Sequence, residues 1–140
     1  MPDSTQQLTD LITEFLTEDQ GEAAPPQVVA ALATVGNGQL RRNSGNPLGI
    51  GKATVLKQLA AYLVSHYLVG TRPSPTNTYL GQMSAVIKSF FDHQEPPVKI
   101  TKGGLAALAA LALGHMTDFY PPSARFMMAT QIAQFYVDGL

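Results

Sequence analysis

Cysteine and tryptophan are both absent from the 140-residue chain. Without a thiol, the protein can form no disulfide, no thiolate metal site and no cysteine nucleophile. The first 40 residues contain no lysine or arginine, so we expect neither a signal peptide nor an arginine-rich transit peptide there. The longest uncharged apolar run, Gly103–Gly114, has 12 residues, whereas a membrane-spanning helix needs about 20. We therefore expect an intracellular, soluble protein with no inserted segment, free or within an assembled particle.

Charged side chains are also scarce. They make up 14% of the chain, against about 25% in an average soluble domain. Serine, threonine, asparagine and glutamine number 33, against 19 charged residues. Such a surface is either that of an ordinary domain with few charges, or one that is largely covered by copies of itself or by a partner, because the centres of interfaces are depleted in charge. A net charge of −1 does little to keep monomers apart and favours the second interpretation.

The few charges are segregated along the chain. Residues 1–22 hold six acids and no base, whereas residues 23–91 hold six bases and no acid. The acidic segment could lie against the basic one, within one subunit or between neighbours. Alternatively, four bases could contact an anion or nucleic-acid phosphates through a loop and helix start at 39–57: Arg41, Arg42, Lys52 and Lys57. The pI near 6.2 and the lack of an aromatic residue in the loop favour the first interpretation.

The hydrophobic pattern predicts helices and almost no sheet. Leu8, Ile12 and Leu16 recur at the spacing of one helix face, and Gly21 is expected to end this helix. No stretch shows a convincing strand-like alternation of apolar and polar residues. We therefore expect an all-α protein, a compact bundle of five to six helices with negligible sheet, forming a single domain over residues 1–140.

A second, short helix is predicted to precede a long loop. Val28, Leu32 and Val35 mark this helix, and Gly36 is expected to stop it. Residues 36–51 contain five glycines, three asparagines and one proline, a composition typical of irregular chain. Loops of this length are often functional.

Two later helices are predicted to be buried on most of their circumference. One runs from about residue 52 to 69, and is expected to be central and to end at Gly70. The other, around Leu105–Leu113, consists of leucine, alanine and glycine and needs cover on all sides. A small bundle has one central position, so this surplus of buried helix favours self-association. The residues expected at contacts between copies are Leu105, Leu108, Leu111, Phe126, Phe135 and Tyr136.

No motif indicates catalysis. Residues 45–52 approach a phosphate-binding loop, but Asn46 stands where the first glycine is needed and Ala53 replaces the hydroxyl residue. Three histidines, His66, His93 and His115, lack metal-site spacing, and whether they converge is left open. We expect no catalytic residue, no metal and no cofactor.

The sequence therefore predicts a protein that acts by association rather than by chemistry. The first hypothesis is a non-enzymatic, self-associating structural or scaffold protein, such as a coat, shell or filament subunit. The second is a nucleic-acid-associated protein, and the third is a helical adaptor for another protein. The partners expected are copies of the chain, with nucleic acid or a heterologous protein as alternatives.

Overall fold

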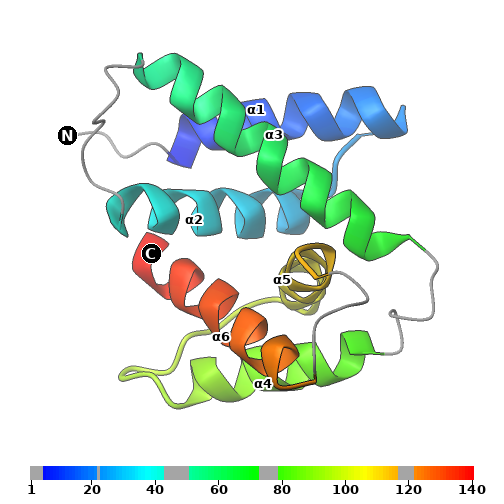
Figure 1. Cartoon of the computed structure of the whole chain (residues 1–140). Helices are drawn as coiled ribbons and strands as arrows, with labels where there is room; N and C mark the ends of the chain where they lie inside the picture. The colour runs from blue at the N-terminus through cyan, green and yellow to red at the C-terminus, as the bar shows by residue number, and fades with distance from the viewer. Residues whose placement is uncertain (1–4, 22, 43–50, 73–78, 117–121) are drawn as a thin grey trace.

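The computed structural model describes residues 5–21, 23–42, 51–72, 79–116 and 122–140. Over these ranges the chain forms six helices and no strand: α1 Thr5–Gln20, α2 Pro26–Arg42, α3 Lys52–Thr71, α4 Leu80–Asp92, α5 Lys102–Gly114 and α6 Pro122–Gly139 (Figure 1). The predicted all-α bundle is confirmed. Figure 1 shows α1 and α3 at one end of the bundle, α4 with the first turns of α6 at the other, and α2 and α5 between them.

Helix α5 occupies the centre of the bundle. Its start is capped by Thr101, whose hydroxyl oxygen accepts a hydrogen bond of 3.0 Å from the Gly104 N–H. Residues 107–113 are all buried, because α5 packs against α2, α3, α4 and α6. The predicted burial of this apolar helix is confirmed, but its cover comes from its own chain.

Helix α1 follows its sequence pattern closely. Leu8, Ile12 and Leu16 are buried against α2 and α3, and the acidic residues between them are exposed to solvent. The helix ends before Gly21, whose φ of 68° lies in the left-handed region that glycine adopts without strain.

Helix α2 does not stop at Gly36 but continues to Arg42. The loop predicted at 36–51 is therefore wrong for residues 36–42, and residues 43–50 lie outside the described ranges. The cause is tertiary packing: a Cβ on Gly38 would collide with the Phe135 carbonyl oxygen of α6, and one on Gly139 would collide with the Thr34 carbonyl oxygen of α2. Glycine is used here for close approach between two helices, which outweighs its low helix propensity.

Helix α3 also continues through a glycine that was expected to end it. It runs to Thr71. Gly70 lies so close to α5 that a Cβ at this position would collide with the Ala110 carbonyl oxygen. One side of α3 faces solvent, with Tyr62 44% and Val69 43% exposed. The prediction that α3 is central is therefore wrong, and among the helices that the structure describes only α5 fills the middle. The surplus of buried helix that favoured self-association is not present.

Candidate functional site

The six residues expected at contacts between copies have three different environments. Leu108 and Leu111 are completely buried in the chain's own core, so their assignment to an intermolecular contact is wrong. An apolar pattern on all faces of a helix cannot distinguish cover by the same chain from cover by a copy, which explains the error. Leu105, Phe135 and Tyr136 are partly buried against the core. Phe126 is 51% exposed and remains available.

Phe126 borders a surface groove between α4 and α6, named here the α4–α6 groove. The groove has a volume of about 490 Å³ and is lined by Ala85, Val86, Ser89, Phe90, His93 and Thr130. A small hollow beside it, lined by Gln82, Met83, Val86 and Phe126, connects the ring to the same face. These lining residues include no acid and no lysine or arginine, so an apolar partner group could enter without removing a full charge from water.

The arginines predicted to meet nucleic acid are engaged within the chain. One Arg41 guanidinium nitrogen donates hydrogen bonds to the carbonyl oxygens of Asp138, at 2.9 Å, and Leu140, at 2.8 Å. Arg42 pairs with the Asp138 carboxylate and lies over the Phe135 ring, 5.6 Å from its centroid. Arg41 therefore binds backbone oxygens at the C-terminal end of α6, where carbonyls lack helical partners, and Arg42 binds a side chain of the same helix end.

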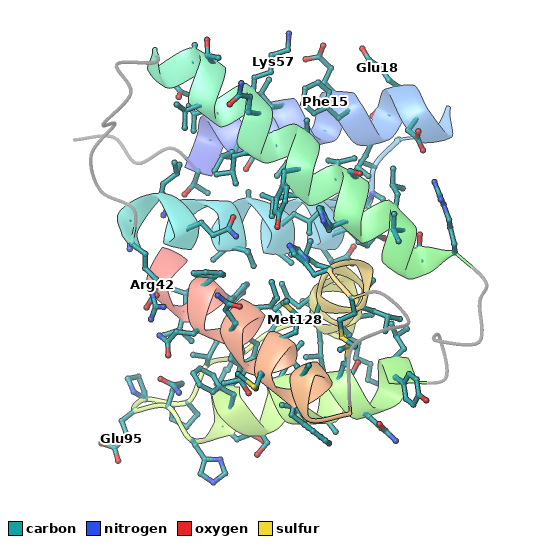
Figure 2. The ribbon with its side chains drawn as sticks, in the orientation of Figure 1. Phe15, Glu18, Arg42, Lys57, Glu95 and Met128 are labelled. Atoms are coloured by element: carbon teal, nitrogen blue, oxygen red, sulfur yellow. The ribbon has the colours of Figure 1, made fainter. Side chains whose placement is uncertain are left out.

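The other two predicted bases belong to α3. Lys57 is exposed on its outer side, and Figure 2 shows it on the same side of α2 as α1, opposite Arg42. Lys52 is the first residue of α3, and its side chain lies outside the described set. The structure thus separates Lys57 from the arginines rather than gathering the bases on one described surface.

Two of the three histidines converge. The rings of His66 and His115 stack with centroids 4.1 Å apart and an interplanar angle of 24°, and the Tyr62 ring lies against both. His93 lies elsewhere, at the C-terminal end of α4. The sequence offered no signal for this cluster, because it depends on how α3 crosses α5.

Backbone carbonyls fix the tautomer of the stacked pair. The Nδ1 of His66 lies 2.8 Å from the Tyr62 oxygen, and the Nδ1 of His115 lies 2.7 Å from the Leu111 oxygen. A carbonyl oxygen only accepts, so each Nδ1 carries the hydrogen. Burial lowers the pKa of His115 below its ordinary 6.5, against the Leu111 hydrogen bond, which raises it, and with a further lowering from His66.

This histidine pair does not resemble a metal site. A metal ion lies in the plane of each ring that ligates it, and two nearly parallel stacked rings do not direct their Nε2 lone pairs to one point. Within the described ranges, no three His, Cys, Asp or Glu side chains come together as metal ligands. The arrangement is that of aromatic packing with one desolvated imidazole.

A second hollow, named here the α1–α3 groove, lies at the other end of the bundle. Its volume is about 620 Å³, and it is lined by Gln7, Asp10, Leu11, Ala53, Leu56 and Lys57. Asp10 accepts a hydrogen bond of 3.0 Å from Gln6, and within the described part of the chain neither Asp10 nor Lys57 forms an ion pair. Charge segregation in the sequence signalled an acidic helix beside a basic segment, but not the groove between them.

Comparisons with known proteins add no further constraint. No protein-family model, curated protein or solved structure matches this chain. Among the described helices, none is both long enough and apolar enough to cross a membrane.

Proposed function

We propose that this chain is a non-catalytic structural subunit that associates with copies of itself through the α4–α6 groove. The observation that carries the proposal is the half-exposed Phe126 ring beside a groove of about 490 Å³ whose described lining residues include no acid, lysine or arginine. Exposed aromatic residues next to apolar hollows are typical of the anchors that dominate binding energy at protein interfaces. A chain with 14% charged residues leaves few side chains to oppose such a contact.

The occupant is a second copy because this face holds both a projection and a recess. Phe126 and Thr130 lie one turn apart on α6, the first at the rim and the second in the groove. A two-fold contact requires one surface to be complementary to itself. Phe126 of each copy can then enter the groove of the other, against Val86 and Phe90.

The alternative of nucleic-acid binding has less support than it had from the sequence. Arg41 and Arg42, two of the four bases assigned to it, hold the end of α6. Among the described residues that line the two grooves, the ionisable ones are one histidine, one aspartate and one lysine, and their division between the two ends of the bundle gives enzymatic activity little support.

Sedimentation equilibrium at low micromolar protein tests the proposal. We expect Phe126→Ser to raise the dissociation constant by roughly a thousandfold, corresponding to about 2 kcal/mol at each of the two buried aromatic anchors of a two-fold contact. The matched control is Met127→Ser, since Met127 is the next residue and is 72% exposed but does not line the groove. A wild-type chain that stays monomeric at high micromolar concentration, or equal losses for the two variants, would contradict the proposal.

A further inference from the structure

We infer that the α1–α3 groove is a second contact between copies, in which Asp10 of each copy pairs with Lys57 of the other. This inference rests on the proposed function, because it assumes that the chain self-associates. It adds a contact of different chemistry at the other end of the bundle, where Figure 1 shows α1 and the first turns of α3 on the opposite side of α2 and α5 from α4.

The lining of the groove combines an apolar floor with two opposite charges. Leu56 is buried and Leu11 half-buried between the helices, whereas Asp10 and Lys57 are both exposed. Asp10 belongs to the α1 wall and Lys57 to the α3 wall. Among the described lining residues, one acid and one base stand on the two walls, so a partner that presents the same pair can match both charges.

The positions of the two charges favour one of two possible orientations of the two-fold axis. With a two-fold axis along the groove, α1 of each copy lies over α3 of the other, and Asp10 meets Lys57 twice. With the axis across the groove, Asp10 would face Asp10 and Lys57 would face Lys57, and like charges in contact are destabilising. The first arrangement forms two ion pairs over the apolar floor, which is the self-complementarity that a two-fold contact needs.

Two different two-fold contacts on one subunit produce an assembly larger than a dimer, which is a closed dihedral particle where the two axes intersect at a suitable angle and an open chain otherwise. Each copy would bind one neighbour through α4–α6 and another through α1–α3, and no rotation closes the series after two subunits. Assembly would therefore extend beyond a dimer as long as both grooves are intact.

The test isolates the α1–α3 groove in the Phe126→Ser background, where the other contact is removed. We expect this variant to form dimers at low ionic strength that dissociate as salt is added, because exposed charges are screened. Adding Lys57→Asp should raise the dissociation constant at least about tenfold, since two ion pairs become two repulsions. Adding Asp10→Lys as well should restore the dimer by exchanging the charges.

Glu18→Lys is the control for Asp10→Lys, because it makes the same acid-to-lysine charge change on α1 at a residue that does not line the groove. It should leave the dimer intact. Circular dichroism verifies that each variant is folded, as expected for substitutions at exposed positions. A monomeric Phe126→Ser protein at low salt, a swapped pair that fails to restore the dimer, or a loss equal to that of Lys57→Asp in the control would overturn the inference.

Failure of the two proposals can be distinguished. If Phe126→Ser still forms particles larger than a dimer, the α4–α6 contact is refuted. The α1–α3 contact is then tested by whether Lys57→Asp dissociates those particles and the swapped charge pair restores them. If wild type forms only dimers that Phe126→Ser abolishes, the α4–α6 contact stands and the second contact is refuted.

Discussion

The α2–α6 and α3–α5 pairs cross through the same backbone arrangement, in which a glycine of each helix lies against a carbonyl oxygen of the other. In the first pair Gly38 faces Phe135 and Gly139 faces Thr34. In the second pair Gly70 faces Ala110 and Gly114 faces His66. In all four helices the contacting carbonyl lies four residues before the glycine, so both crossings are reciprocal. The glycine hydrogens point at carbonyl oxygens, a geometry that recurs in close helix packing.

The side chains around the two crossings differ in kind. At α2–α6, the buried Asn37 amide donates a hydrogen bond of 3.0 Å to the Gly139 carbonyl oxygen, and two arginines hold the same helix end. At α3–α5, a stack of Tyr62, His66 and His115 covers the crossing. The comparison teaches that one backbone packing can be reinforced by polar ties or by rings, which should respond differently to mutation and pH.

The largest expected effect comes from adding a methyl group to a glycine at either crossing. Gly38→Ala and Gly114→Ala each place a Cβ against a carbonyl oxygen of the partner helix, so the helices must separate. We expect each to lower the free energy of unfolding by about 3 kcal/mol or more, at the upper end of overpacking effects. Urea unfolding measures the change.

Gly81→Ala is the control for these substitutions. Gly81 is exposed in α4, and a Cβ there would meet nothing within 4 Å. Alanine should raise the free energy of unfolding by about 0.5–1 kcal/mol through helix propensity. If Gly38→Ala or Gly114→Ala behaved like Gly81→Ala, the close approach of that pair would be refuted.

An intermediate effect should distinguish the polar crossing from the ring-covered one. Asn37→Ala removes the hydrogen bond to the buried Gly139 carbonyl and leaves that oxygen without its side-chain donor. We expect a loss of about 1–3 kcal/mol in urea unfolding, the usual cost of an unsatisfied buried group. Thr34→Ala, which deletes a hydroxyl bonded only to its own helix, should change stability far less. Equal losses for the two variants would contradict a special role for Asn37.

The smallest effect is a pH dependence confined to the α3–α5 crossing. The pKa of His115 is lowered by burial, so the unfolded chain binds a proton more readily than the folded one below the ordinary value of 6.5. Stability should therefore fall as pH drops below 6.5 and level off below the folded pKa. The fall in stability below pH 6.5 that His115 causes should be absent from His115→Gln and should persist in His93→Gln. Parallel stability curves for wild type and His115→Gln would refute the desolvated imidazole.

The spacing of apolar residues predicted the helices whose burial is evident from their own sequence. The spacing of Leu8, Ile12 and Leu16 predicted α1, because one buried stripe on an exposed helix leaves a clear period. Gly36 and Gly70 were misread as helix ends, because propensity alone cannot indicate that another helix will use a missing side chain for close packing.

The candidate surfaces were only partly predictable. Phe126 was included among six candidates, yet sequence gave no means of separating it from the enclosed Leu108 and Leu111. The α1–α3 groove and the His66–His115 stack arise between helices that are distant in sequence. Such sites depend on crossing geometry, which the periodicity of a single helix does not contain.

The attachment of α6 to α2 has a consequence for how the protein is made. Asn37 and Arg41 bind oxygens of residues 138–140, roughly a hundred positions later in the chain. As synthesis proceeds from the N-terminus, the face of α2 that contains Thr34 and Gly38 stays uncovered until the last turn of α6 has left the ribosome. Contacts of such long sequence separation form late and slow folding. A nascent chain halted before residue 138 would expose the face of α2 that α6 covers in the folded molecule.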